Sequence, residues 1–169
     1  PAGQNTRRIL DALDAKGIKA TFFMVGEMAR NNPALARNVI ARGHTVGSHT
    51  HRHPNLAAMS HADAVAEIAR GERALREAGI PDLPFFRFPY LADTPALRGH
   101  LAARGIVVVD VDIDSKDYFR ISPVRVATRT MRDLRRRGSG IILFHDLHAR
   151  TASMLPTFLN MLEREGYKV

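Results

Sequence analysis

The feature that most constrains the fold of this chain is a regular alternation of helix-type and strand-type segments along its whole length. Apolar residues at helical spacing, with capping residues before them and a glycine behind, predict helices at 6–16, 32–43, 60–79, 94–104, 123–138 and 153–165. Short apolar runs between them predict strands at 20–25, 45–48, 85–87, 106–111, 141–144 and 167–169. The run at 106–111 is nearly continuous, as is typical of a parallel strand covered on both faces. The alternation predicts an α/β fold with a parallel sheet, either doubly wound or a barrel.

The start of the series breaks this pattern. It opens with a helix, whereas each unit of such a fold is normally entered from a strand, so a first strand is expected upstream. The chain also begins with Pro1 rather than Met, which indicates a processed or trimmed product. We therefore interpret residues 1–169 as a single domain that is N-terminally incomplete. No apolar run approaches the roughly 20 residues that span a bilayer, so no transmembrane segment is predicted.

Composition excludes several kinds of site. The chain has no cysteine, which excludes disulfides, thiolate metal ligands and cysteine nucleophiles. Its formal charge of +8 would suit a polyanionic partner. Much of the excess lies in one predicted helix, at Arg125, Arg129, Arg132, Arg135, Arg136 and Arg137. A solvated outer face explains this cluster better than a binding patch, and without a nucleic-acid-binding motif we predict no nucleic-acid partner.

Polar residues with catalytic chemistry fall where the predicted strands end. In parallel α/β folds, active sites form at the carboxyl ends of the strands. One strand is followed by His49 and His53, the next ends at Arg87, another is followed by Asp114 and Asp117, and a fourth ends at His145 and Asp146. A buried charge at a strand end needs a partner, so this distribution predicts one convergent site.

His49 and His53 are candidate metal ligands. They are four residues apart, a spacing that one helical turn would place on a single face, and two neutral imidazoles suit zinc or a similar divalent ion. A catalytic zinc usually has three protein ligands, and the third could come from Asp114, from Asp117 or from the missing strand. His51 lies off the shared face and is interpreted as structural, as are His44, His61 and His100.

His145 is a candidate proton donor, because imidazole titrates near neutrality and a nearby carboxylate would keep it protonated. Asp117 ends a neighbouring strand and could be that carboxylate. The alternative is a capping histidine with Asp146 in solvent. Arg87 likewise has an alternative interpretation, a salt bridge that holds two loops.

Five segments together resemble the polysaccharide deacetylase family, also called carbohydrate esterase family 4 or the NodB-homology domain. They cover essentially the whole chain, in the family's order: ATFFMVG at 20–26, GHTVGSHTHRHP at 43–54, RFPY at 87–90, DSKDY at 114–118 and LFHD at 143–146. The resemblance implies an irregular (β/α)7-type barrel with its first strand absent from this chain. It also marks three departures: Phe88 where proline is frequent, Leu91 where glycine is frequent, and Tyr118 where tryptophan is usual.

The same resemblance implies the ligands and the base. The metal would be held by His49, His53 and an aspartate of the family's first motif, Thr-Phe-Asp-Asp-Gly-Pro, which also supplies the general base. Pro1 aligns with the last residue of that motif, so the chain alone is expected to be inactive. Either the chain was cut, or the upstream piece is separate, or the protein is a pseudoenzyme.

The implied reaction is metal-dependent removal of N-acetyl groups from an amino-sugar polysaccharide of the chitin, peptidoglycan or exopolysaccharide type, with one divalent metal, zinc by preference. Arg87 would orient the upstream aspartate, the Tyr90 N–H would bind the oxyanion, Leu143 would line the pocket for the acetyl methyl, and His145 with Asp117 would protonate the departing amine. The resemblance implies an extracytoplasmic location. The alternatives are an amidohydrolase or deformylase acting on a lipid-linked sugar or small amide, and a non-catalytic glycan-binding domain.

Overall fold

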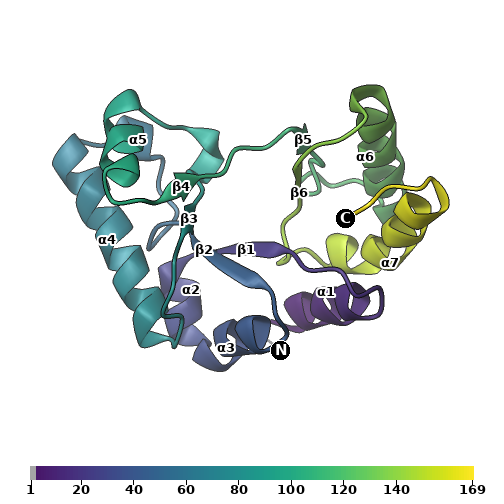
Figure 1. Ribbon diagram of the computed structural model, residues 1–169, viewed down its shortest axis with the longest axis horizontal. Coiled ribbons are helices and arrows are strands. Elements are labelled where there is room, and N and C mark those ends of the chain that lie inside the picture. The colour runs from purple at the N-terminus through teal and green to yellow at the C-terminus, as the bar shows by residue number, and fades with distance from the viewer. Residues whose placement is uncertain (1–2) are drawn as a thin grey trace. The chain divides into compact units, whose positions relative to one another are not determined.

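The computed structural model describes residues 3–169 and shows an α/β fold in which all paired strands are parallel (Figure 1). The chain forms two compact units. We call residues 20–110 the central unit, and residues 3–19 together with 111–169 the terminal unit. Pro1, on which the alignment with the first motif rests, lies outside the described residues.

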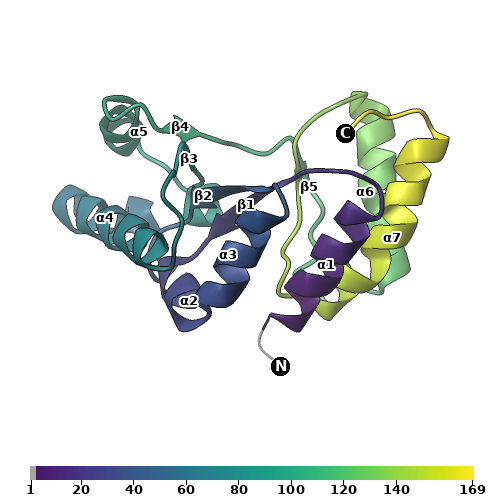
Figure 2. The same cartoon turned by 60° about the horizontal axis from the view of Figure 1, so that its bottom comes forward.

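The central unit is built on a parallel sheet with the strand order β1-β2-β3-β4. Its elements are β1 (Thr21–Met24), α2 (Gly26–Asn31), α3 (Pro33–Ala41), β2 (Thr45–Ser48), η1 (Leu56–Ala58), α4 (His61–Glu77), β3 (Phe85–Phe86), η2 (Pro89–Leu91), α5 (Pro95–Ala102) and β4 (Val107–Val108). Residues Thr21 to Met24 pair in order with Thr45 to Ser48, so β1 and β2 end together. Helices α2 and α4 pack side by side (Figure 2). A buried cluster around Ile68, Phe86 and Leu101 joins the sheet to α4 and α5.

Helix ends in this unit follow ordinary capping chemistry. The side chains of Asn32, Ser60 and Thr94 each accept a hydrogen bond from the backbone N–H three residues ahead. Proline occupies the first turn of α3 and α5, where no N–H is needed. These caps place the helix starts where the sequence predicts them.

The terminal unit joins the two ends of the chain. Its elements are α1 (Gln4–Asp14), β5 (Ile113–Asp114), α6 (Pro123–Arg137), β6 (Ile142–Leu143) and α7 (Ala149–Arg164). Strands β5 and β6 are parallel, with Asp114 opposite Leu143. Helix α7 packs against both α1 and α6 (Figure 2). The fully buried Leu10, Met131 and Phe158 contribute one core residue from each helix.

Four sequence predictions are corrected here. The strand expected at 106–111 is only β4, and Val107 is 54% exposed rather than covered, because an apolar run does not show whether a helix packs on both faces. Strand β5 and helix α2 were not predicted, because each is too short to show a periodicity. Residues 167–169 form no strand, since the N–H of Tyr167 closes the end of α7 by bonding to the Leu162 carbonyl. No helix among the described residues has the length and apolar character that crossing a bilayer requires.

Candidate active site

His49 and His53 come together in a tight loop that follows β2. Their ring centroids are 4.7 Å apart and the rings are nearly perpendicular. The loop is not helical, so the predicted reason for this proximity is wrong. Thr50 (φ 66°) and His53 (φ 62°) both have left-handed backbone conformations, which fold the chain back sharply between the two imidazoles. Such conformations are costly for residues other than glycine and are often found at functional sites.

Helix α4 fixes this loop through a buried carboxylate. Glu67 is 3% exposed, and its Oε1 accepts hydrogen bonds from the N–H groups of His51 (3.1 Å) and Arg52 (2.6 Å). Gly71 lets the helix approach closely, since a Cβ there would lie 2.5 Å from the carbonyl carbon of Thr50. Sequence reasoning missed both residues. The sequence signal that could have identified them is the presence of a glutamate and a glycine on the apolar face of the helix predicted at 60–79.

The orientation of His49 fits a metal ligand. Its Nδ1 lies 2.8 Å from the carbonyl oxygen of Arg87, and an Nδ1–H donor there places the lone pair for a metal on Nε2. Metal-binding histidines commonly donate their second ring N–H to a backbone carbonyl in this way. The His53 ring packs edge-on against Tyr90, with centroids 4.8 Å apart. Among residues 3–169, however, no group of three or more possible ligands comes together, so the pair is an incomplete donor set.

His51 has the structural character expected of it. It is 7% exposed, and its Nδ1 has no hydrogen-bond partner within the described part of the chain. His44 is equally buried, and its Nδ1 accepts the N–H of Ala20 at 3.2 Å. Neither ring takes part in the contact between His49 and His53.

Arg87 is buried at the end of β3, and only 8% of it is exposed. Its Nε donates to the Val109 carbonyl at 3.1 Å, and its guanidinium lies 4.2 Å above the ring centre of Phe23. Within the part of the chain that the structure describes, Arg87 forms no salt bridge between two loops, and its hydrogen bonds go to the backbone carbonyls of Val109 and Asp110. Burial lowers the pKa of Arg87, and the negative charge of Asp110 partly opposes this.

Tyr90 and Leu91 form a strained turn after β3. Both residues have a left-handed backbone, with φ of 59° and 54°. The hydrogen bonds of the turn are donated by the N–H groups of Leu91 and Ala92, and the N–H of Tyr90 takes no part in them. Tyr90 is 69% exposed. Glycine would adopt this left-handed conformation at lower cost than Leu91, which fits the glycine that the family resemblance leads us to expect at this position.

In the terminal unit, Asp117 holds His145 by two hydrogen bonds. Asp117 is fully buried, its Oδ1 is 2.7 Å from His145 Nδ1, and its Oδ2 accepts the backbone N–H of His145 at 2.7 Å. The hydroxyl of Thr151, at the start of α7, donates to the same Oδ2 at 2.6 Å. The expected pairing of His145 with Asp117 is therefore present, and Thr151 is a partner that the sequence did not reveal.

The charge state of Asp117 follows from these contacts. Burial, the largest single influence, raises the pKa of Asp117. The hydrogen bonds from His145 and Thr151 and the attraction of His145 together outweigh burial, so the pKa is lower than usual. Asp117 is thus an ionised carboxylate at neutral pH that faces an imidazole. The carboxylate holds the ring of His145 through Nδ1 and would attract a positive charge that forms on it during a reaction.

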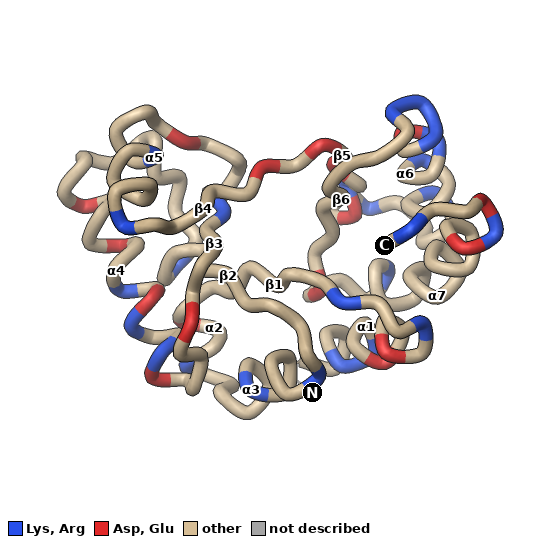
Figure 3. The backbone as a smooth tube through the Cα atoms, viewed as in Figure 1, with Lys and Arg blue, Asp and Glu red and all other residues tan. Residues whose placement is uncertain are grey.

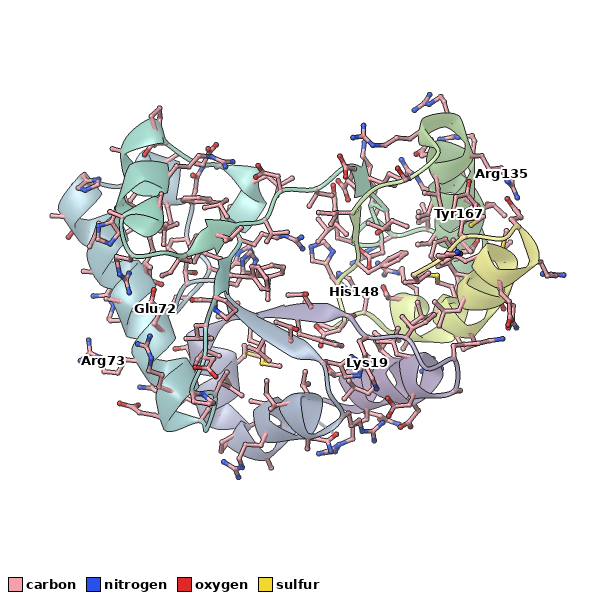
Figure 4. All side chains as sticks on the ribbon, viewed as in Figure 1. Lys19, Glu72, Arg73, Arg135, His148 and Tyr167 are labelled. Carbon is pink, nitrogen blue, oxygen red and sulfur yellow. The ribbon has the colours of Figure 1, made fainter. Side chains whose placement is uncertain are left out.

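The loops beside His145 are also anchored. The hydroxyl of Thr6 in α1 donates to Asp146 Oδ2 at 2.6 Å, so Asp146 is not simply solvated as the capping alternative supposed. Arg150 donates to the backbone carbonyl of Asp117 at 2.7 Å. Burial is the main cause that lowers the pKa of the neighbouring His148 (Figure 4).

Asp114 and Leu143 lie opposite each other on the neighbouring strands β5 and β6. Asp114 Oδ2 accepts the hydroxyl of Tyr118 at 2.8 Å, and the Tyr118 ring stands edge-on to His145 with centroids 5.4 Å apart. The predicted site residues therefore form two groups, one in each unit. His49, His53, Arg87 and Tyr90 belong to the central unit. His145, Asp117 and Leu143 belong to the terminal unit, and the expected convergence of all seven stays a prediction.

The two groups have different chemical capacities. An imidazole pair with one ring held by a carbonyl can bind a divalent cation. An imidazole held by a buried carboxylate can transfer a proton near neutral pH.

Comparisons with known proteins identify the family. The family model described as polysaccharide deacetylase matches residues 1–109. A chitin deacetylase from Colletotrichum lindemuthianum is 32% identical over 96% of this chain and 71% of its own length. The chain spans only 35% of the length of matched peptidoglycan-N-acetylglucosamine deacetylases from Listeria monocytogenes, to which it is 29% identical over 99% of its own length.

Solved structures agree over nearly the whole chain. A family 4 carbohydrate esterase from Streptomyces lividans, in complex with acetate, has a TM-score of 0.87 and 32% identity over 99% of this chain and 85% of that one. A family pseudoenzyme from Bacillus anthracis has a TM-score of 0.91 and 25% identity over 100% of this chain and 59% of that one. The predicted fold class is confirmed, because the deacetylases among these neighbours have a (β/α)7-type barrel. The chain belongs to the polysaccharide deacetylase family.

Proposed function

We propose that the protein is a metal-dependent hydrolase that removes N-acetyl groups from an amino-sugar polysaccharide. The observation that carries the proposal is the pairing of His145 Nδ1 with the buried carboxylate of Asp117 at 2.7 Å. A packing role would not require a buried charge to hold a half-exposed imidazole. Related chitin and peptidoglycan deacetylases act on the corresponding class of bond.

His145 would donate a proton to the departing amine nitrogen. Since Asp117 holds the Nδ1 side of the ring, Nε2 is the atom that carries the transferable proton. The buried carboxylate would face the ring during transfer, and the hydrogen bonds from Thr151 and the His145 N–H keep the carboxylate oriented. Proton donation by a positioned group of this kind typically accelerates a reaction by about 10²–10⁴-fold.

His49 and His53 would hold one divalent metal, with zinc as the first candidate because two imidazoles suit it. When bound, such an ion polarises the amide carbonyl and activates a water. The proposal needs a further ligand and a general base, which the family resemblance assigns to an upstream aspartate. Metal identity is part of the proposal and is open to direct analysis of the purified protein.

The other residues would position the acetamide. The backbone N–H of Tyr90 would stabilise the oxyanion, and the strained turn at Tyr90 and Leu91 fixes its direction. Leu143, half-buried on β6, would contact the acetyl methyl group. Arg87 would orient the aspartate through donors other than the Nε that holds the Val109 carbonyl. Polymers of chitin, peptidoglycan or exopolysaccharide type would place the protein outside the cytoplasm.

The test is acetate release by the complete protein from soluble N-acetylglucosamine oligomers, with an Asp117→Asn variant as the matched control. This substitution keeps the shape of the side chain and removes its charge. Release by the wild type and a lower rate in the variant would support the proposal. Activity on a lipid-linked sugar or a small amide, with none on the oligomers, would favour a related amidohydrolase or deformylase.

A second candidate function is glycan binding without hydrolysis. It is favoured by one observation, the close structural match to a pseudoenzyme of the same family. Saturable binding of the oligomers without acetate release, by a protein with a full complement of metal, would support it against the hydrolase.

A further inference from the structure

Helix α6 of the terminal unit carries a row of arginines that no role in hydrolysis explains (Figure 3). Arg125, Arg129 and Arg132 share one face, since they are separated by four and three residues. Together with Ile121 and Thr128 they line an open hollow of about 470 Å³, and no acidic residue lines it. The hollow therefore presents three positive charges to whatever enters it.

The arginines at the other end of α6 differ from these. Arg135, labelled in Figure 4, forms an ion pair with Glu165, and Arg137 forms one with Asp112. By contrast, no carboxylate among residues 3–169 lies within ion-pair distance of Arg125 or Arg129. Arg132 forms an ion pair with Asp133, which also lies 3.6 Å from Arg136. Within residues 3–169, ion pairs therefore neutralise arginines along the carboxyl-terminal turns of the helix and at Arg132, but not at Arg125 and Arg129 of the hollow.

Two further observations indicate that an anion belongs there. The Nε of Arg129 is buried and has no hydrogen-bond partner within residues 3–169, and a buried unsatisfied donor is rare and costly in a native protein. In addition, Arg125 and Arg129 form a like-charge pair four residues apart, which destabilises a helix unless an anion lies between them. A solvated outer face accounts for neither feature.

The hollow lies near the segment that follows β5. Arg129 also lines a second hollow, of about 450 Å³, together with Asp114 and Lys116. Burial and the hydrogen bond to Asp114 raise the pKa of Tyr118, while the nearby charge of Arg129 acts in the opposite direction. Arg129 therefore lies close to the loop whose Asp117 holds His145.

We propose that Arg125, Arg129 and Arg132 bind the carboxylate or phosphate groups of an anionic glycan. The glycan assignment rests on the proposed function, but the anion site itself does not, because it shares no residue with the hydrolytic group. Nucleic acid is disfavoured because the lining of the hollow has no aromatic side chain on which a base could stack. Guanidinium groups bind carboxylate and phosphate oxygens in a bidentate manner, so the site suits either anion.

The test compares two triple variants of the complete protein. Arg125→Gln/Arg129→Gln/Arg132→Gln removes the row of charges, and Arg7→Gln/Arg8→Gln/Lys168→Gln removes three exposed charges elsewhere in the same unit. Affinities are measured by titration calorimetry, in low and high salt, for three probes. These are soluble peptidoglycan fragments with free stem-peptide carboxylates, a neutral N-acetylglucosamine hexamer, and a short DNA duplex.

We expect the α6 variant to lose about tenfold to a hundredfold in affinity for the carboxylated fragments at low salt, and less at high salt. The control variant should keep that affinity, and both should bind the neutral hexamer like the wild type. An equal loss in the control would overturn the proposal, because net charge would explain the binding. Tighter binding of the DNA duplex than of the fragments, lost in the α6 variant alone, would overturn the glycan assignment.

Failure of the proposed function would look different. A protein that releases no acetate from any glycan, yet shows the expected affinity pattern, would contradict the hydrolase and support the anion site. Normal acetate release together with unchanged affinities in the α6 variant would contradict the anion site alone.

Discussion

The two units hold their histidines by different physical means. In the central unit, His49 and His53 are aimed by the backbone, through left-handed residues and a loop anchored by Glu67. In the terminal unit, His145 is aimed by a charged partner, Asp117, which contacts both its ring and its N–H. The central unit has four non-glycine residues with positive φ among those described, and the terminal unit has only Lys116.

This difference fits two chemical tasks. A metal site tolerates little change in the distance between its donors, and backbone strain locks that distance. A proton donor needs a tuned charge state, which a buried carboxylate supplies. Variants that break one device should therefore leave the other intact, and this separation can be tested.

The largest effect is expected from the proposed metal-binding pair, His49 and His53. His49→Ala or His53→Ala should abolish tight binding of a divalent metal, and hydrolysis with it, because one donor is then lost from an already small set. His51→Ala is the matched control between them, and it should keep its metal because this ring lies outside the pair. Mass spectrometry measures the metal content of each variant, and competition with a chelator measures its metal affinity. Equal losses from all three variants would refute the assignment of the pair.

The next effect in size concerns the proton donor. His145→Ala should lower kcat by about 10²–10⁴-fold while the metal content stays at the wild-type level. Steady-state kinetics and metal analysis on the same preparation measure both. A normal rate would mean that His145 is a cap, and loss of metal would mean that it is a ligand.

Removing the charge of Asp117 should have a smaller and more specific effect. In Asp117→Asn the ring of His145 faces a neutral amide in place of the carboxylate, which removes an attraction for a positively charged ring. The alkaline limb of the profile of kcat against pH should therefore move toward acid pH. A pH profile with an unchanged alkaline limb and a lower maximal kcat would show that Asp117 positions the ring of His145 without affecting its charge state.

The same carboxylate should also affect stability in acid. Its pKa is lower in the folded protein than its unfolded value of about 3.9, so the folded state binds fewer protons. This contribution is present above about pH 4 and is lost as the pH falls through the folded pKa. Urea unfolding at a series of acid pH values should show a steeper loss of stability for the wild type than for Asp117→Asn. Parallel curves would contradict the pKa shift.

Much of the fold was predictable because it depends on local signals. Caps at Asn32, Ser60 and Thr94 mark helix starts, and β2 has the bounds that its apolar run indicates. The extent of β4 was not predictable, because coverage of a strand depends on distant helices. The position at which the run at 106–111 breaks off is likewise set by tertiary packing.

Candidate site residues were predictable where strand ends present unusual polar types, as at His49 and His145. Their supports were not. Glu67 acts on a loop 15 and 16 residues earlier, and Thr151 acts on Asp117 34 residues earlier. No periodicity links residues at such separations. The helical reason given for the His49 and His53 pair failed because backbone conformation at Thr50 and His53 is set by contacts with α4, including the close approach at Gly71.

The smallest effect tests whether backbone strain is particular to the central unit. Leu91 has φ of 54° and is 42% exposed, so a substitution there changes strain more than burial. Leu91→Gly relieves a left-handed conformation that costs a residue with a Cβ about 1 kcal/mol, although glycine also increases the entropy of the unfolded chain. Leu91→Ala keeps the Cβ and removes the same distal atoms.

We therefore expect Leu91→Gly to be more stable than Leu91→Ala by about 0.5–1 kcal/mol in urea unfolding. Lys116, with φ of 53° in the terminal unit, offers the matched pair Lys116→Gly and Lys116→Ala, and the same order of stability is expected there.

The glycine substitutions at Leu91 and Lys116 should differ in their effect on kcat. Leu91→Gly should make the turn more flexible and the Tyr90 N–H, the proposed oxyanion donor, less fixed. This should lower kcat, because only a fixed N–H stabilises developing charge efficiently. Lys116→Gly should leave kcat nearly unchanged, since Asp117 is held by His145 in the loop after β6 and by Arg150 and Thr151 in α7. A greater loss of kcat at Lys116 than at Leu91 would show that backbone strain matters to the proton donor as well.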